Sequence, residues 1–361
     1  MWPYWVLFLI PACLAVSRLK PNTNHLNLIK QNRWPDSWRL MFIYLVLMIG
    51  LRHETGGDWP QYMEMIKSYR DNTSQDNYGF QDPAFVLLNR LSAWSGMDLY
   101  FLNLFSAVIF SWGLVVFCRA QTYPWLTLLV SVPYLITVVA IGYTRQGVAI
   151  GIAMVAMVAL SNGNTIRFIF WIGIAALFHK SAILLIPMAI LASSKRRFLT
   201  ALWVVVAGLT LFILLLQEAT SILFDGYIEA GYQSSGANIR IAMNAFPALL
   251  FLVFAKRFKI SNEERTFWKW MSWGALTFVP LLIVSPSSTA VDRVALYWIP
   301  LQLYILPRLP AALGKIDGKN PVLVYSVVAY SAFVHFVWLF YADTSSAWIP
   351  YQFYPWVWLW Q

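Results

Sequence analysis

Apolar runs recur from end to end of the chain and are separated by short polar segments. Runs of this kind predict membrane-crossing α-helices, because a helix satisfies its own backbone hydrogen bonds in lipid. Several runs are shorter than the about 20 residues of a straight crossing, which tilting or re-entrance accommodates. The pattern predicts an all-α, polytopic transmembrane bundle of roughly 10–12 segments. The segments are residues 2–17, 37–51, 99–117, 124–141, 146–160, 166–178, 181–192, 199–216, 241–255, 266–284, 291–306 and 322–341.

The apolar stretch 124–160 is too long for a single crossing. At the helical rise it would extend about 55 Å, well beyond the hydrocarbon thickness. Pro133, Gly142 and Arg145 supply residues suited to a turn. We therefore expect two helices that meet near Gly142.

The stretch 166–192 also divides, for a reason of charge. A single crossing would place Arg167 and the basic cluster at 195–197 on opposite sides of the membrane. Positively charged loops favour the cytoplasmic side, so both belong on the inside. A hairpin of two short helices satisfies this condition and leaves His179 and Lys180 at its outer tip.

Composition and loop charge support one integral membrane domain over residues 1–361. The chain is 59% hydrophobic and 12% charged, against about 25% charged residues in soluble domains, and its mean hydropathy is +0.59. With the segments alternating across the membrane, 18 of the 26 basic residues lie inside. The net charge of +10 is then explained by inner loops, and we expect no nucleic-acid partner.

Three outer regions follow from this topology: a loop at about 52–97, a loop at about 217–239 and an aromatic tail at 342–361. The first loop predicts a helix that begins after Asp58, a plausible N-cap, and a second helix over 82–94. We expect the apolar face of the second helix to contain Phe85, Leu88 and Leu91. The Gly- and Ser-rich second loop is either a mobile lid or an ordinary surface loop.

Four arginines stand at or near the outer ends of apolar helices: Arg52, Arg145, Arg240 and Arg293. Arginine binds phosphate well because its planar fork gives paired, charge-assisted hydrogen bonds and stays ionised. The alternative for any one of them is interfacial anchoring. All four together are poorly explained that way, because the positive-inside bias disfavours basic residues at the outer face. A diphosphate-bearing ligand at the membrane surface fits them better.

Other outer polar residues have more than one open interpretation each. Asp58 and Asp292 are general bases, partners of an arginine, or structural residues, with an N-cap as the structural role of Asp58. His179 accepts a hydroxyl proton or contacts phosphate, or is a satisfied structural histidine, and Lys180 binds ligand or snorkels. The aromatic tail anchors the chain at the bilayer interface, stacks on sugar rings, or does both.

No zinc-binding, Asp-rich, Walker or nucleophile-elbow motif occurs in the sequence. We therefore expect no metal and no cofactor. The simplest chemistry is then departure of a diphosphate whose charge the arginines compensate.

Short motifs in a defined order resemble the EpsG-like, Wzy-type polysaccharide polymerases. Residues 52–62 resemble the family's Arg-x-x-x-Gly-x-Asp-x-x-x-Tyr segment, and Tyr143 to Gln146 resemble its Arg-Gln helix start. The remaining resemblances are Phe178 to Ser181, Asp292 to Tyr297, and Trp348 to Tyr351. The order and spacing of these short motifs extend over nearly the whole chain.

The resemblance implies a GT-C-like glycosyltransferase in the bacterial inner membrane. Such enzymes join oligosaccharide repeat units carried on undecaprenyl diphosphate at the periplasmic face, as O-antigen or exopolysaccharide polymerases. A chain-length regulator is a possible protein partner, beside membrane lipid. The expected catalytic residues are Asp58, His179 and Arg145. The expected substrate-binding residues are Arg52, Arg240, Arg293, Tyr62, Gln146, Lys180, Asp292 and Tyr297.

Other functions remain open at this point. An O-antigen ligase uses the same donor but a different acceptor. A transporter or flippase for lipid-linked sugar would line a path from face to face with polar residues. A membrane acyltransferase is less favoured, because the arginines have no obvious purpose in it.

Overall fold

The computed structural model describes residues 1–21, 34–71, 82–188, 202, 206, 233–314 and 319–360. Within them the regular secondary structure is helical except for one pair of two-residue strands. Five helices are long and apolar enough to cross a membrane: α6 (Asp98–Arg119), α8 (Thr144–Ser161), α13 with η6 (Ala237–Phe254, Ala255–Arg257), α14 (Asn262–Val284) and α18 (Pro321–Tyr341). The predicted all-α polytopic bundle is confirmed, and the protein is a multi-pass membrane protein.

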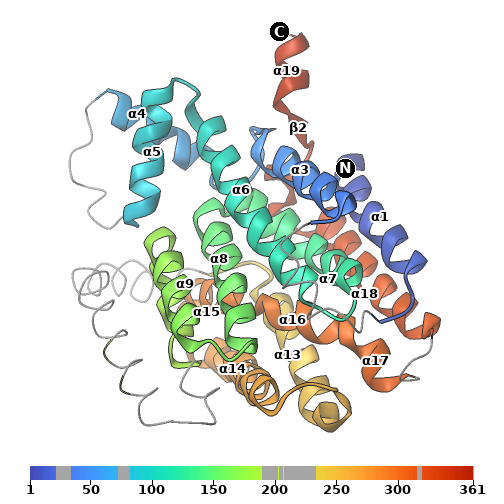
Figure 1. Cartoon of the computed structure of the whole chain (residues 1–361). Coiled ribbons are helices and arrows are strands. Elements are labelled where there is room, and N and C mark those ends of the chain that lie inside the picture. Colours follow the sequence, from blue (N-terminus) through green and yellow to red (C-terminus); the bar gives the residue numbers. More distant parts are fainter. Residues whose placement is uncertain are drawn as a thin grey trace.

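The centre of the bundle is α8, which packs between α6 and α9 (Thr165–Phe178) (Figure 1). α6 and α8 cross very closely, because a Cβ added to Gly113 would lie 2.1 Å from the carbonyl oxygen of Gly151. Small residues at such crossings let two backbones approach, which is how helices associate in lipid.

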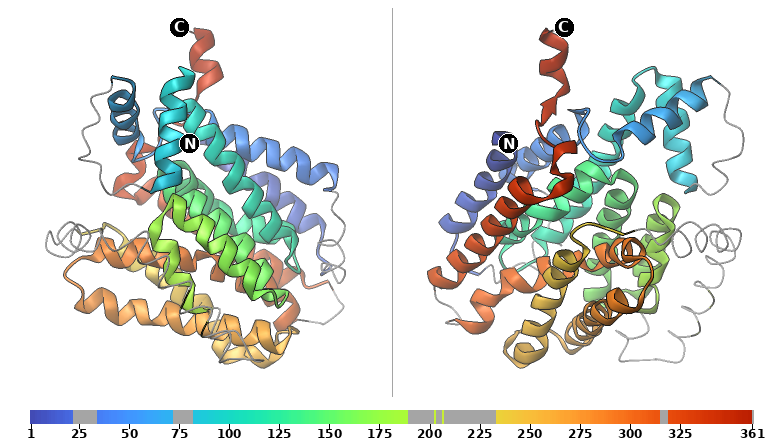
Figure 2. Two further views of the ribbon diagram at one scale, coloured as in Figure 1. Left: turned by 60° about the vertical axis from the view of Figure 1, so that its left-hand side comes forward. Right: turned by 180° about the vertical axis from the view of Figure 1, so that it is seen from behind.

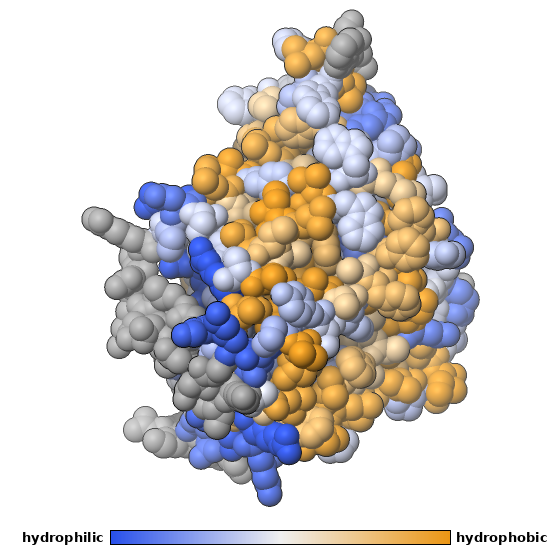
Figure 3. Space-filling model, turned by 90° about the vertical axis from the view of Figure 1, so that its right-hand side faces the viewer, coloured by the Kyte–Doolittle hydropathy of each residue, from blue (hydrophilic) through white to orange (hydrophobic). Residues whose placement is uncertain are grey.

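Further helices surround this centre. α3 (Asp36–Gly50) packs on α6, and α1 (Trp2–Ser17) packs on α7 (Pro124–Ser131) and α18. α13 packs on α14. Figure 3 shows a broad hydrophobic face between hydrophilic margins, and α18 exposes Val322 and Phe333 by 74% and 66%. Such a surface is suited to contact with lipid chains.

The two expected divisions of long apolar stretches are both present. α7 continues as η2 (Val132–Ala140), and the helical run extends through Gly142. Only Tyr143 separates it from α8, which begins at Thr144. α9 ends at His179, whose backbone is extended, and η3 (Lys180–Leu185) follows. The expectation that Pro133 contributes to the turn is wrong, because the chain stays helical through it as a π-helical run. Residues 189–192 of the expected hairpin lie outside the described residues.

The predicted segment 291–306 is shorter and more regular than the observed one. The observed run comprises α15 (Ser288–Ala295), η7 (Leu296–Trp298), α16 (Ile299–Ile305), η8 (Leu306–Arg308) and α17 (Leu309–Leu313). Prolines at 300, 307 and 310 each remove a backbone donor, which accounts for the alternation of α and 3₁₀ turns.

The first outer loop folds into the two expected helices, α4 (Trp59–Arg70) and α5 (Pro83–Ser95). Phe85 and Leu88 are buried as expected, whereas Leu91 is 39% exposed and does not belong to the packed face. Asp58 occupies the N-cap position of α4 as expected, but its side chain makes no capping hydrogen bond. Residues 72–81 of this loop and 217–232 of the second loop lie outside the described residues, as does the predicted helix 199–216 apart from 202 and 206.

The C-terminal tail joins the same end of the bundle. After α18 and η9 (Asp343–Ala347), β2 (Gln352–Phe353) pairs antiparallel with β1 (Arg52–His53), and α19 (Tyr354–Trp360) projects beyond it. Figure 2 shows α4, α5 and α19 gathered at one end. α3 ends there, and its 15 residues place its first turn about 22 Å away at the opposite end.

Candidate functional site

The end of the bundle that carries α4, α5 and α19 also collects the polar residues singled out in the sequence. Some come from the segment after α3 and from the starts of α4 and α8. Others come from the break between α9 and η3, and from α13, α15 and η7. Contacts described below connect these elements into one neighbourhood. The residues are Arg52, Asp58, Tyr62, Arg145, Gln146, His179, Lys180, Arg240, Asp292, Arg293 and Tyr297.

Asp58 is the carboxylate at the centre of this neighbourhood. Its backbone N–H donates to the carbonyl of Gly142 at 3.4 Å, which fixes it against the turn before α8. Its Oδ2 accepts a hydrogen bond of 3.0 Å from the buried Tyr62 hydroxyl. Burial raises the pKa of Asp58, and the charges of Arg293 and Arg145 together with the Tyr62 hydrogen bond oppose that rise. The site therefore holds a desolvated carboxylate among cations.

Arg145, in the first turn of α8, presents its guanidinium beside this carboxylate. The guanidinium lies over the rings of Tyr62 and Phe85, 5.9 and 5.6 Å from their centroids. Its Nη1 is 3.8 Å from Oδ2 of Asp82, which is too long for a hydrogen bond. Aromatic packing thus sets the plane of the guanidinium, while its edge retains donors for a ligand.

Asp82 is a site residue that the sequence interpretation missed. It stands at the start of α5, directly before Pro83, where an aspartate normally reads as an N-cap. Its side chain makes no capping bond; instead Oδ1 accepts the backbone N–H of Lys180 at 2.9 Å. Burial raises the pKa of Asp82 to about 6, against the opposing charge of Arg145. Asp82 therefore holds the α9–η3 break against α5.

His179 occupies that break. Its Nδ1 lies 3.1 Å from the hydroxyl of Tyr297, which is fully buried in η7. Burial, reinforced by the charges of Arg145 and Arg293, lowers the pKa of His179 to about 3. The imidazole is therefore neutral near physiological pH and a weak base.

Arg293 and Arg145 are joined through the residue next to Arg145. Gln146 Nε2 donates to the backbone carbonyl of Arg293 at 2.6 Å, which ties the start of α8 to α15. Arg293 is half-buried, and its charge acts on Asp58. The two arginines thus approach Asp58 from different helices in a fixed relation.

Arg240 and Asp292 form a paired structural contact beside these residues. Arg240 donates from Nε and Nη2 to the two oxygens of Asp292 at 2.8 and 2.7 Å. Ser234 donates to Asp292 Oδ2 at 3.0 Å and accepts from Arg240 Nη2 at 2.6 Å. This bidentate pair holds α13 against α15, the helix that carries Arg293.

A family model described as the EpsG family matches residues 37–353 of this chain. The chain belongs to the EpsG family. The match spans every site residue named above and leaves out only α1 and α19 among the described helices. Comparison with curated proteins and with solved structures gave no significant match.

In this EpsG-family protein the Arg52 side chain is almost completely buried and forms its hydrogen bonds with protein groups. It is 2% exposed and donates to the carbonyls of Ile49 and Thr55 at 2.6 and 3.1 Å. Its Nη2 also donates to Asn103 Oδ1 and Thr144 Oγ1, both at 2.8 Å. These bonds connect the end of α3 with α6 and α8, directly behind Arg145.

The aromatic tail supports the Gly142 turn from outside. Trp348 is 2% exposed, and its ring lies so close that a Cβ on Gly142 would be 2.0 Å from Cζ2. The Tyr4 hydroxyl donates to the carbonyl of Trp348 at 2.8 Å, and the Tyr351 hydroxyl donates to that of Met48 at 2.7 Å. The tail therefore packs into the EpsG-family fold next to the site.

Among the described residues no three His, Cys, Asp or Glu side chains gather as a group suited to a metal ion. The expectation of chemistry without metal or cofactor stays a prediction.

Proposed function

We propose that this protein is a polysaccharide polymerase, a glycosyltransferase that joins undecaprenyl-diphosphate-linked oligosaccharide repeat units. The reaction would take place at the periplasmic face of the bacterial inner membrane. Membership of the EpsG family supports a Wzy-like polymerase in general terms. The observation that carries the proposal is the approach of Arg145 and Arg293 to the Asp58 carboxylate at one end of a membrane bundle.

The two arginines suit the departing diphosphate. Charge develops on the leaving oxygen as the glycosidic bond breaks, and fixed cations lower the energy of that state. Tyr62 and Phe85 orient Arg145, and the hydrogen bond from Gln146 to the backbone carbonyl of Arg293 holds the backbone that carries the Arg293 side chain. Lys180, adjacent to His179, supplies a further cation for the same group.

Asp58 suits the role of general base better than His179. A base needs a pKa near the working pH, and burial moves Asp58 toward that range, whereas it moves His179 away from it. In the proposed step the acceptor hydroxyl oxygen attacks the anomeric carbon of the donor sugar. The bond from that carbon to the diphosphate oxygen breaks, lipid diphosphate leaves, and the hydroxyl proton passes to Asp58.

The remaining predicted residues act by positioning in this proposal. Arg240 and Asp292 bind each other, so they hold α15 rather than the diphosphate. Arg52 supports the start of α8, and Tyr297 orients His179. His179 then presents a neutral donor or acceptor to sugar.

The site lies at helix ends, where a polyprenyl diphosphate places its head group while its chain stays in the bilayer. The donor and acceptor would therefore enter from the membrane. The GT-C-like fold and a chain-length regulator partner are part of the proposal and rest on the family resemblance.

The test is product analysis with purified protein in liposomes that contain the undecaprenyl-diphosphate repeat unit of the host. The proposal predicts a ladder spaced by one repeat unit. Asp58→Asn should reduce the rate by about 10²–10⁴, the usual contribution of a positioned base, and Glu64→Gln, an exposed carboxylate of the same α4 helix, should leave it unchanged.

Transfer only to lipid A-core would instead identify a ligase. Movement of the lipid-linked sugar across the bilayer without bond formation would identify a transporter.

A further inference from the structure

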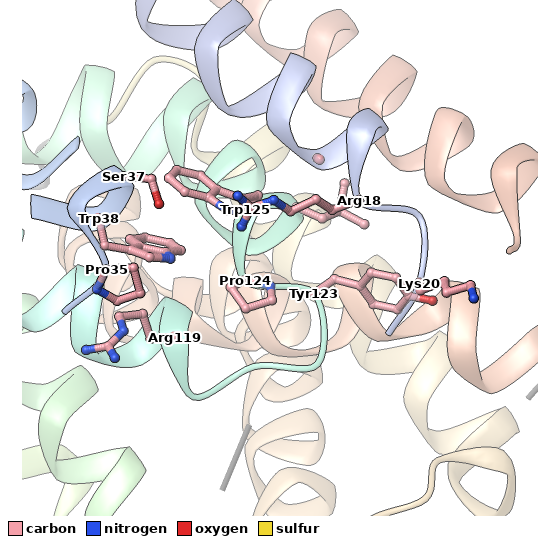
Figure 4. Close-up of a pocket in the computed structure, with 11 residues that line it drawn as sticks. Arg18, Lys20, Pro35, Ser37, Trp38, Arg119, Tyr123, Pro124 and Trp125 are labelled. Atoms are coloured by element: carbon pink, nitrogen blue, oxygen red, sulfur yellow. The ribbon is translucent and has the colours of Figure 1, made fainter. Parts of the chain in front are cut away.

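A cavity of about 340 Å³ lies at the end of the bundle opposite to the candidate site, where α1 ends, α3 begins, and α6 gives way to α7 (Figure 4). Its volume falls within the about 300–1,000 Å³ of small-molecule sites. Its lining includes Arg18, Lys20, Arg119, Trp38, Tyr123 and Trp125. The proposed polymerase reaction gives it no role.

The charge of this cavity is entirely positive. Its described lining contains three cations and no carboxylate. Within the described part of the chain, neither Arg18 nor Lys20 has a carboxylate within 4.0 Å. The nearby Asp36 pairs with Arg39 at 3.2 Å. An anion would therefore meet uncompensated charge here.

A neighbouring cavity at the same end shows that this charge pattern is not general. That cavity, of about 710 Å³, is lined by Glu263 and Glu264 as well as by Lys259 and Arg308. Arg308 and Glu264 lie 3.8 Å apart, so its charges are already balanced. The selective absence of carboxylates from the smaller cavity points to an anionic ligand.

Aromatic rings hold the guanidinium of Arg18 in a defined place. Trp38 and Trp125 stack with centroids 4.1 Å apart, and Arg18 lies over Trp125 at 5.7 Å. Figure 4 shows the Arg18 guanidinium at the Trp125 indole, with Tyr123 next along the cavity and Lys20 beyond Tyr123. Trp125 is 3% exposed, and its Nε1 has no hydrogen-bond partner among the described residues. A buried indole N–H of this kind is a donor that a ligand can satisfy.

The position of the cavity favours a lipid as the source of the anion. It stands at helix ends, where tryptophans gather at the membrane interface. Next to it α1 and α3 expose apolar side chains, including Leu9 at 52%, Leu40 at 68% and Ile43 at 51%. A phospholipid can place its phosphate in the cavity and its acyl chains along these helices. Basic pockets between transmembrane helices bind anionic head groups by this means.

We propose that this cavity is a binding site for the phosphate head group of an anionic phospholipid, held by Arg18 and Lys20 against the Trp38–Trp125 stack. The site is independent of the polymerase proposal, because it lies at the other end of α3. It would fix the depth of α1 and α3 in the leaflet that contains it.

The test measures binding of phosphatidylglycerol to the full-length protein in phosphatidylcholine nanodiscs, by native mass spectrometry across a lipid titration. Arg18→Gln and Lys20→Gln should each weaken binding of one phosphatidylglycerol about fivefold, the effect of one cation near a membrane surface. Arg257→Gln is the matched control, since this exposed arginine at the same end lies over Phe254 at 5.5 Å but lines neither cavity. It should leave that binding unchanged.

Three results would overturn the proposal. One is equal loss in all three variants, which would indicate general charge at the surface. Another is equal binding of phosphatidylcholine and phosphatidylglycerol. The last is displacement of the lipid by millimolar glycerol phosphate in the buffer, which would assign the cavity to a soluble phosphate ester.

Discussion

Arg52→Met is expected to destabilise the protein strongly. Arg52 is 2% exposed and donates four hydrogen bonds of 2.6–3.1 Å, to two carbonyls, one amide oxygen and one hydroxyl. Methionine retains the apolar stem but leaves the two carbonyl oxygens and Asn103 Oδ1 without this donor. Each buried acceptor left unsatisfied costs about 1 kcal/mol or more, so the loss in free energy of unfolding is about 3 kcal/mol.

The assay is equilibrium unfolding of the purified variants in detergent, followed by circular dichroism. Arg52→Lys should fall between wild type and Arg52→Met, because a compact ammonium cannot reproduce the planar fork. Arg39→Met is the control, since Arg39 is exposed and, among the described residues, pairs with the exposed Asp36; its effect should stay within about 0.5 kcal/mol. Wild-type stability of Arg52→Met with loss of polymer synthesis would refute the reasoning and make Arg52 a substrate ligand.

Three further predictions concern the site. Tyr62→Phe removes a hydrogen bond that lowers the pKa of Asp58, so the acid limb of the rate profile should move to higher pH; an unmoved limb would mean that another group titrates. Arg240→Gln and Asp292→Asn should each lower the free energy of unfolding by more than half of the loss in the double variant, because each substitution leaves its partner unpaired. Additive losses in unfolding measurements would show that the pair is not coupled. His179 is neutral because burial lowers its pKa to about 3, so the pH profile of the rate should show no transition near the ordinary pKa of histidine. His179→Gln should leave the shape of that pH profile unchanged.

The gathering of the polar motifs at one end was predictable. Each helix crosses the bundle, and the basic residues in the loops indicate which end of each helix belongs to the same side. Arg145 and Arg293 are 148 positions apart, yet they meet through Gln146 for this reason. The break at His179 was predictable by the same argument. These conclusions needed only hydropathy and the positions of basic residues.

The roles of individual side chains were not predictable, because they depend on where each side chain points. Arg52 and Arg145 look alike in sequence, but the first donates to protein carbonyls and the second packs over two rings. Asp82 resembles an N-cap and instead holds the backbone of Lys180. The contact of Trp348 with Gly142 joins segments with no local signal between them.

The central claim is that Arg145 stabilises the departing diphosphate. The most direct measurement is the steady-state rate of ladder formation by purified Arg145→Gln in liposomes, with Arg90→Gln as the matched control. Arg90 is exposed in the outer helix α5 and lies over Tyr69 at 5.7 Å, so it reproduces an arginine on an aromatic ring away from Asp58.

We expect kcat of Arg145→Gln to fall by about 10²–10³, the effect of losing one donor to developing charge, with Arg90→Gln unchanged. A raised KM with unchanged kcat, or equal effects of the two substitutions, would contradict the claim, because Arg145 would then contribute only to binding or to surface charge.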